Sequence, residues 1–243
     1  MGARMKRILV GIGAVLLVLA VAAGAVFYSA FGNSRPIVDG QSLGSGVQVV
    51  KDGFVSVDLL DVAPGKVALI DAGNDKSGKA ILAALAARGL APASVAAIFL
   101  THGHGDHVAG CRLFPGADVY ALENEVGLIG AAAKVNHPLR DGDVVEVGNL
   151  RVEAFASPGH TPGSAVYLAR GVLFFGDSAG GGKDGTLMPA VRVFSKDTNQ
   201  NIASLKALAA RLQPRAAEVK TLAFAHSGPL EGFAPLAASA NTH

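Results

Sequence analysis

Three histidines and an aspartate crowd into six residues directly after a short apolar run. Residues 96–100 have the length and apolarity of a buried strand, and His102, His104, Asp106 and His107 follow them. Imidazoles held close together disfavour one another's protonation, and each ring nitrogen needs a partner. A divalent metal ion of borderline softness removes both problems by binding the neutral nitrogen lone pairs. We therefore predict a metal-binding loop at the end of a strand, held in place by a rigid sheet.

Three further candidate ligands also follow strand-like segments. His160 lies in the segment Pro-Gly-His-Thr-Pro-Gly, Asp177 in Phe-Gly-Asp-Ser, and His226 in Phe-Ala-His-Ser-Gly. Taken singly, each has an ordinary interpretation as a turn histidine, a helix N-cap aspartate or a surface histidine. Taken together with the first cluster, they are expected to complete a metal site.

The rest of the chain alternates between strand and helix patterns in two halves. The apolar runs and turns predict strands at 47–50, 54–60, 67–70, 96–100, 144–147, 150–155, 165–168, 172–175 and 221–225. Helical spacing of apolar residues predicts helices at 77–88 and 202–212. This order indicates an α/β (α+β) domain in which two sheets are covered by helices.

The order of these motifs resembles the metallo-β-lactamase-fold hydrolase family over about residues 37–230. That family has His-x-His-x-Asp-His, then a Gly-His-Thr histidine, a Gly-Asp aspartate and a late histidine, all present here in that order. The resemblance implies an αββα sandwich. It also implies a first metal ion on His102, His104 and His160, a second on Asp106, His107 and His226, and a bridge between the two through Asp177. Asp71 matches the family's early strand-end aspartate and is expected to orient a ligand or loop.

Histidine and aspartate ligands without a thiolate suit two zinc ions, although iron or manganese fits the same donors. Two such ions share a bridging hydroxide that attacks a carbonyl or phosphoryl centre, and Asp106 is the expected proton acceptor or relay. We therefore predict a dinuclear zinc hydrolase that acts on a small molecule with an ester-like bond, such as a thioester or a lactone.

The bridging Asp177 resembles the glyoxalase II, lactonase and phosphodiesterase branches, whereas true β-lactamases generally lack this carboxylate. The glyoxalase II resemblance is incomplete, because few residues follow His226 and a C-terminal glutathione-binding domain has no room. The tyrosine typical of lactonases is absent from residues 178–183, and no RNA-holding arm is evident. The alternatives are an iron-dependent sulfur dioxygenase, a β-lactam or phosphodiester hydrolase of the same fold, and a non-catalytic binding module, which would lack some ligands.

The charge and the cysteine content of the chain exclude several classes of partner and of metal site. With Arg4, Lys6 and Arg7 set aside, acidic residues slightly outnumber basic ones, so nothing predicts a nucleic-acid partner. The single Cys111 excludes an intramolecular disulfide and a cysteine-rich zinc module, and is expected to be a buried thiol on a helix. The oligomeric state is left open by the sequence.

The N-terminus has the pattern of a membrane-targeting segment. Its three cationic residues precede an uncharged run at 8–28 that would be about 31 Å long as a helix. We therefore predict a signal anchor and linker at 1–34, and a hydrolase domain at 35–243 outside the cytoplasm on the periplasmic side. The alternative is a signal peptide cleaved near Ala23-Gly24-Ala25, which would release the domain.

Residues 179–200 are predicted to form a loop or lid beside the metals, and its cations Lys183, Arg192 and Lys196 are candidates for contacting an anionic substrate, or simply solvated charges. Other conspicuous residues are assigned no role in the site. These are His137 in an irregular stretch, the terminal His243, and the strand tyrosines Tyr120 and Tyr167.

Overall fold

The computed structural model describes residues 3–44 and 46–242, which form two compact units that divide between residues 33 and 34. The first unit contains the helix α1 (Ala3–Phe31). Within the described residues, no helix is long and apolar enough to cross a membrane. The transmembrane anchor predicted at 8–28 therefore gains no support from the structure, and His243 lies outside the described residues.

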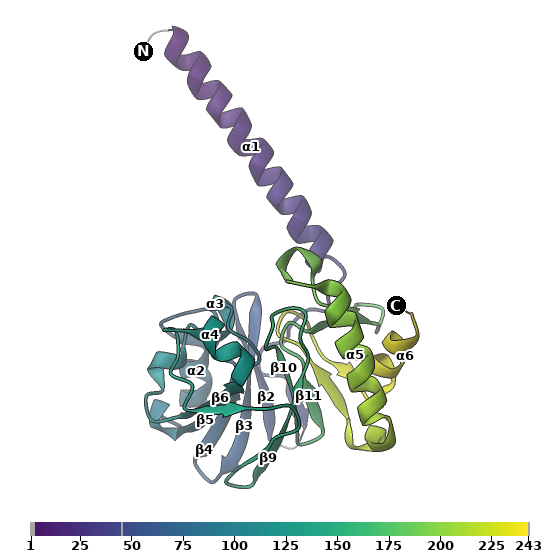
Figure 1. The fold of residues 1–243 in the computed structure, drawn as a ribbon. Coiled ribbons are helices and arrows are strands. Elements are labelled where there is room, and N and C mark those ends of the chain that lie inside the picture. The colour runs from purple at the N-terminus through teal and green to yellow at the C-terminus, as the bar shows by residue number, and fades with distance from the viewer. Residues whose placement is uncertain (1–2, 45, 243) are drawn as a thin grey trace. The chain divides into compact units, whose positions relative to one another are not determined.

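The second unit is built on two sheets that divide the chain into halves (Figure 1). The first sheet has seven strands in sequence order: β1 (Ser42–Gly44), β2 (Val47–Asp52), β3 (Val55–Ala63), β4 (Lys66–Ile70), β5 (Val95–Phe99), β6 (Asp118–Leu122) and β7 (His137–Leu139). The strands β1 to β4 are antiparallel, and β4 to β7 are parallel. Parallel pairing requires crossovers, which contain α2 (Lys79–Ala87), α3 (Gly105–Val108) and α4 (Val126–Ile129).

The second sheet has six strands and is mostly antiparallel. Its order is β15 (Leu230–Glu231), β14 (Thr221–Ala223), β11 (Val172–Phe174), β10 (Ala165–Ala169), β9 (Leu150–Ala156) and β8 (Val144–Val147). The long helix α5 (Thr198–Leu212) lies between β11 and β14 in the chain, and α6 (Ala234–Thr242) follows β15. A separate small hairpin pairs β12 (Ala179–Gly181) with β13 (Leu187–Pro189).

Alternating side chains along the strands place one core between the sheets and one on each outer face. In β10, Tyr167 belongs to the core shared by both sheets, whereas its neighbours Val166 and Leu168 pack with Leu205 and Leu208 of α5. In β4, Ala68 faces the shared core and Leu69 packs with Ile81 of α2. This period-two alternation gives four layers, helix–sheet–sheet–helix, with α2 and α5 on opposite outer faces (Figure 1). The predicted αββα sandwich is thus the observed architecture.

Each predicted strand and both predicted helices correspond to an observed element, shifted by a few residues at their ends. The patterns in the sequence do not predict β1, β6, β7, β12, β13, β15, α3, α4 and α6. All of these except α6 have two to five residues, and such short segments show little periodicity. His137, expected in an irregular stretch, begins β7, where it pairs with Asp118 and stacks on Tyr120.

The two sheets are tied together at the edge where β5 ends. The backbone N–H of Ala165, at the start of β10, donates to the carbonyl of Thr101 just beyond β5. The buried hydroxyl of Tyr167 donates to the carbonyl of Leu100 over 2.8 Å. On the other side, the N–H of Ser56 in β3 donates to the carbonyl of Ala225, beyond β14. These bonds fix the segment that carries the histidine cluster against the second sheet.

We predict that Tyr167→Phe lowers the free energy of unfolding by about 1–2 kcal/mol, because the buried carbonyl of Leu100 loses its donor. Tyr120→Phe is the matched control, since its ring packs against Phe99 and His137 and should leave stability within about 0.5 kcal/mol. Urea unfolding followed by circular dichroism measures both. Equal stability of Tyr167→Phe and the parent would contradict this account of the sheet junction.

Candidate metal centre

Four strand ends converge on one edge of the sandwich. His102 follows β5 of the first sheet, while His160, Asp177 and His226 follow β9, β11 and β14 of the second. These three strands of the second sheet run in the same direction, since β9 and β11 are both antiparallel to β10 and β14 is parallel to β11. Their carboxyl ends therefore meet at one edge, as expected for the positions where polar side chains build a site.

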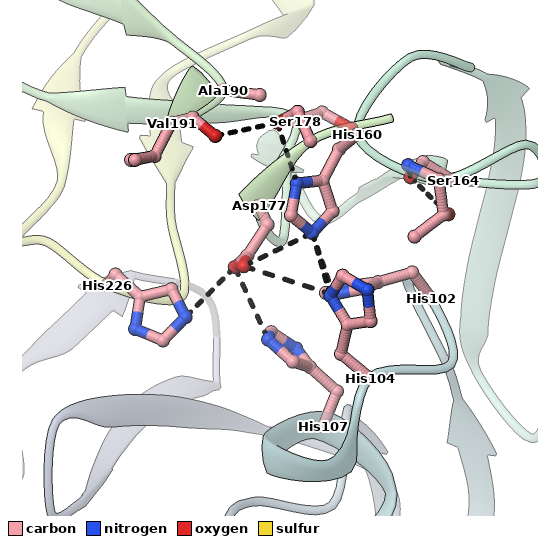
Figure 2. A network of polar contacts seen from close by, with 12 residues as sticks. His102, His104, His107, His160, Ser164, Asp177, Ser178, Ala190, Val191 and His226 are labelled. Atoms are coloured by element: carbon pink, nitrogen blue, oxygen red, sulfur yellow. Dashed lines mark hydrogen bonds and ion pairs between the residues drawn. The ribbon is translucent and has the colours of Figure 1, made fainter. Parts of the chain in front are cut away.

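The first group of converging side chains contains three imidazoles. The Nε2 of His102 lies 3.1 Å from the Nδ1 of His104 and 3.2 Å from the Nε2 of His160, and those last two nitrogens are 3.0 Å apart. Nitrogens of three side chains thus form a nearly equilateral triangle that faces the carboxylate of Asp177 (Figure 2). This is one of the two groups in the described chain whose ligand atoms are close enough to hold a metal ion.

The second group contains Asp106, His107 and His226. The Nε2 of His226 lies 3.3 Å from Asp106 Oδ2, and the Nε2 of His107 lies 3.8 Å from the same oxygen. Asp106 and His107 sit on the single turn of α3, and His226 reaches them from the end of β14. All seven residues predicted as ligands are therefore brought together.

Asp177 lies between the two groups and turns one oxygen toward each. Its Oδ1 lies 3.3 Å from His107 Nε2 and 3.2 Å from His226 Nε2. Its Oδ2 lies 3.5 Å from His160 Nε2 and 3.9 Å from His102 Nε2. Figure 2 shows the four imidazoles arranged around this carboxylate. One carboxylate thus faces both groups of possible ligands.

The outward-facing nitrogens of four histidines are each held by a neighbouring group. His102 Nδ1 lies 3.1 Å from the Thr101 hydroxyl, His107 Nδ1 2.8 Å from Asp71, His160 Nδ1 3.1 Å from the Ser195 hydroxyl, and His226 Nδ1 3.0 Å from the Phe54 carbonyl. These contacts orient the rings so that their Nε2 atoms face the site. Partners of this kind fix the tautomer and direction of metal-binding histidines.

Asp71, expected to orient a ligand or loop, contacts both. Its Oδ1 accepts the backbone N–H of Thr101, and its Oδ2 accepts the Thr101 hydroxyl and lies beside His107 Nδ1. The residue is buried and has a φ of +61°, an unusual conformation for a non-glycine residue. The strand end of β4 therefore holds the loop after β5 in place.

The glycines before His160 and Asp177 are required by close backbone approach. A Cβ on Gly159, whose φ is +135°, would lie 2.2 Å from the backbone nitrogen of Asn201. A Cβ on Gly176, whose φ is +54°, would lie 2.3 Å from the Thr101 hydroxyl. The Gly-His and Gly-Asp pairs noted in the sequence thus place a ligand directly after a turn that only glycine fits.

Burial and neighbouring charges divide the imidazoles into two kinds. Burial lowers the pKa of His160 to about 4 and that of His102 well below its ordinary value, so both rings are neutral and offer lone pairs. Burial also opposes charge on His107 and His226, but Asp177 together with Asp71 raises the pKa of His107, and Asp177 together with Asp106 raises the pKa of His226 to about 10. The carboxylates therefore draw positive charge to the second group, a charge that a divalent ion also supplies.

Two independent observations indicate that these donor atoms suit metal ions. Three nitrogens bound to one tetrahedral zinc ion at 2.0–2.1 Å would lie about 3.3 Å apart, close to the spacing of the first group. In the second group, the buried His107 Nε2 and Asp177 Oδ1 lie 3.3 Å apart, and neither atom has a hydrogen-bond partner among the described residues. Buried polar atoms without partners are rare and call for an ion or water.

The main residue that the sequence patterns did not reveal is Glu125. Its side chain is completely buried, and its carboxylate accepts three hydrogen bonds of 2.8–2.9 Å, from the backbone N–H of Gly103, the hydroxyl of Thr161 and the backbone N–H of Gly163. It thereby joins the loops of His102 and His160 from behind. The sequence offers no signal for this, because the exposed Glu123 two residues earlier has the same chemistry.

The segment at residues 35–36, where the predicted hydrolase domain begins, is part of the site's support. The N–H of Arg35 donates to the carbonyl of Gly181 in β12, and the carbonyl of Arg35 accepts the N–H of Gly228. A Cβ on Gly228 would lie 2.5 Å from the carbonyl oxygen of Pro36. This segment therefore runs between the loops that follow Asp177 and His226.

The remaining candidates lie outside the cluster or stay untested. Cys111 is buried on a short 3-10 helix (Cys111–Leu113), where burial raises the pKa of its thiol to about 12. Residues 179–200, expected to form a lid, contain the β12–β13 hairpin and Ser195, which contacts His160. Lys183, Arg192 and Lys196 are exposed there, and their contact with a substrate stays a prediction.

Comparison with known proteins finds one family. The sequence profile of the metallo-beta-lactamase superfamily matches residues 50–226. A hydroxyacylglutathione hydrolase of Gloeobacter violaceus is 33% identical over 74% of this chain and 70% of its own length. A hydroxyacylglutathione hydrolase of Aliivibrio fischeri is 36% identical, but the match covers 47% of this chain and 42% of the relative. A metallo-beta-lactamase family protein of Thermus thermophilus has the same fold, with a TM-score of 0.64 at 23% identity over 82% of this chain and 78% of that one.

We predict that Glu125→Gln lowers the free energy of unfolding by about 2–4 kcal/mol, because an amide group would replace an acceptor oxygen that faces buried donors. The matched control is Glu123→Gln. Glu123 forms an exposed ion pair with Arg140, and the loss of this pair should lower the free energy of unfolding by less than about 0.5 kcal/mol. Urea unfolding of protein stripped of metal with a chelator separates this effect from metal binding. A cost of Glu125→Gln no greater than that of the control would refute the joining role.

Proposed function

Because the chain belongs to the metallo-beta-lactamase superfamily and is a hydrolase of that family, we propose that it uses two zinc ions to hydrolyse an acyl thioester or a related ester. The observation that carries the proposal is Asp177, whose two oxygens face the two groups of possible ligands. Acyl chemistry is favoured by the relatives named as hydroxyacylglutathione hydrolases. The chain spans only 42% of the second relative, so its substrate is a proposal.

In this proposal the first zinc ion is held by His102, His104 and His160, the second by Asp106, His107 and His226, and Asp177 contacts both. Zinc ions bound there would lower the pKa of water toward 7 and polarise the carbonyl of the substrate. The donor set also admits iron or manganese, and metal analysis separates these choices.

Asp106 is the residue that we assign to proton transfer. Its side chain is 22% exposed, more than the 13% of Asp177, so it can meet a substrate. Burial alone would raise the pKa of Asp106, but the neighbouring His226 and His107 lower it, so the group is a carboxylate at neutral pH. Asp106 Oδ2 lies 3.3 Å from the Nε2 of His226, so this oxygen would face the second zinc ion, while the other would be left to accept a proton and deliver it to the departing thiolate or alkoxide.

An extracytoplasmic location is a second proposal, based on the sequence alone. Arg4, Lys6 and Arg7 precede the uncharged run at 8–28, as in export signals. A catalytic domain on the periplasmic side, anchored or released by cleavage, would act on exported or extracellular substrates.

Metal content and substrate choice are tested together on the full chain. We expect about two equivalents of zinc after loading and dialysis, and hydrolysis of a thioester in preference to a lactone, a β-lactam or a phosphodiester. Asp177→Asn should lower kcat at least about 100-fold, and His226→Ala should retain about one equivalent of zinc. His137→Ala is the control, because this exposed histidine lies on β7 and contacts Asp118, apart from both groups.

Well under one equivalent of zinc, or iron in the protein as purified together with oxygen uptake in the presence of a persulfide, would refute the proposed reaction. Thioester hydrolysis by His104→Ala at the parent rate would refute the proposed site.

Export is tested by fusing residues 1–45 to alkaline phosphatase, which is active only outside the bacterial cytoplasm. We expect an active fusion, and an inactive one when Leu16 and Leu19 are both replaced by Arg, since two charges in the apolar run cost about 5–7 kcal/mol for insertion. An inactive parent fusion, present at normal level, would place the domain in the cytoplasm.

A further inference from the structure

Part of the surface beside the metal centre is apolar. The described residues of the second unit expose seven large hydrophobic side chains, and these include Phe54, Val126 and Leu128, as well as Val193 and Phe194, in segments that contact the ligand loops. Isolated exposed apolar residues are common, but their grouping around a reaction centre is a feature of binding sites.

Phe54 covers the side of His226. It occupies the tight turn between β2 and β3, where its ring is 51% exposed and stacks on the imidazole at 5.7 Å with an interplanar angle of 9°. The carbonyl of the same residue holds His226 Nδ1 at 3.0 Å. The turn therefore presents an aromatic face directly beside the second group of ligands.

Leu128 covers the loop of the first group. It lies on α4, is 48% exposed, and its Cγ would be 3.1 Å from a Cβ placed on Gly103, the residue between His102 and His104. Glu125 fixes this contact, since it binds the N–H of Gly103 and directly precedes α4.

The same segment carries no charge that a polar substrate would need. From Val126 to Ala133 the sequence is Val-Gly-Leu-Ile-Gly-Ala-Ala-Ala, and its exposed side chains are apolar. The nearby carboxylate of Glu125 is buried and occupied with backbone and hydroxyl donors. An anionic tripeptide such as glutathione would find no complementary charge on this described segment.

We propose that Phe54 and Leu128 form an acyl-chain subsite, so that the protein prefers thioesters or esters of apolar, medium-length carboxylic acids. This inference rests on the proposed hydrolase function and specifies its substrate. The acyl chain lies along α4 and the β2–β3 turn while its carbonyl reaches the metal centre, and hydrolysis adds water across the C–S bond to give a carboxylic acid and a thiol.

The test is a chain-length series on the zinc-loaded full chain, with acetyl, butyryl, hexanoyl and octanoyl thioesters of one small thiol. Full burial of a methylene is worth up to about fourfold, so six more methylenes on a half-exposed surface should raise kcat/KM at least about tenfold from acetyl to octanoyl. Leu128→Ser should reduce this ratio at least about threefold, whereas Leu128→Met, which keeps an apolar side chain of similar size, should keep the ratio of the parent. Val144→Ser, which changes a similarly exposed valine on β8, is the matched control and should keep the parent ratio.

Equal kcat/KM for acetyl and octanoyl thioesters would overturn the subsite and leave the hydrolase function standing. Binding of octanoate and acetate, measured by titration calorimetry, separates the two proposals if no thioester is cleaved. Octanoate that binds at least about threefold tighter to the parent than to Leu128→Ser, with acetate binding unchanged, would then support the subsite without the reaction. Equal binding of octanoate by both proteins would overturn it.

Discussion

The charge of one nearly buried carboxylate is the constraint on which the metal centre depends. Asp177 lies within 3.2–3.9 Å of four imidazole nitrogens contributed by three loops. A buried carboxylate is costly unless positive charge faces it. Here both of its oxygens point toward places where a cation would bind, so the same contacts that stabilise the carboxylate define where metals would sit. The sandwich serves to bring the loops around this one group.

The support behind the ligands explains how loops reach this precision. Asp71 holds the loop after β5, and Glu125 joins that loop to the one carrying His160. Neither group faces the site, yet each determines where an imidazole points. Because outer partners set the orientation of metal-binding histidines, changes at these two carboxylates should matter nearly as much as changes at the ligands.

The position of the site at the meeting edge of two sheets also accounts for its surroundings. The β2–β3 turn and α4 lie on the first sheet's side and present Phe54 and Leu128, whereas the second sheet contributes the β12–β13 hairpin. The candidate ligands thus come from strand ends and from the single turn of α3, while the groups proposed to choose the substrate come from the β2–β3 turn and α4. Such segments can change between relatives while the metal ligands and the fold stay the same.

Local patterns, together with the family resemblance, were enough to locate the strongly periodic elements and the seven candidate ligands. The cluster at 102–107 was the clearest signal, because crowded histidines are costly unless a metal ion binds them. Only the contacts in the folded structure show which oxygen of Asp177 faces which group of ligands. They also show that Glu125, and not Glu123, supports the loops. They also revealed that Arg35 belongs to the hydrogen-bonded loops of the domain. The physical reason is that burial and hydrogen bonding depend on contacts between residues far apart in the chain, which local patterns do not encode.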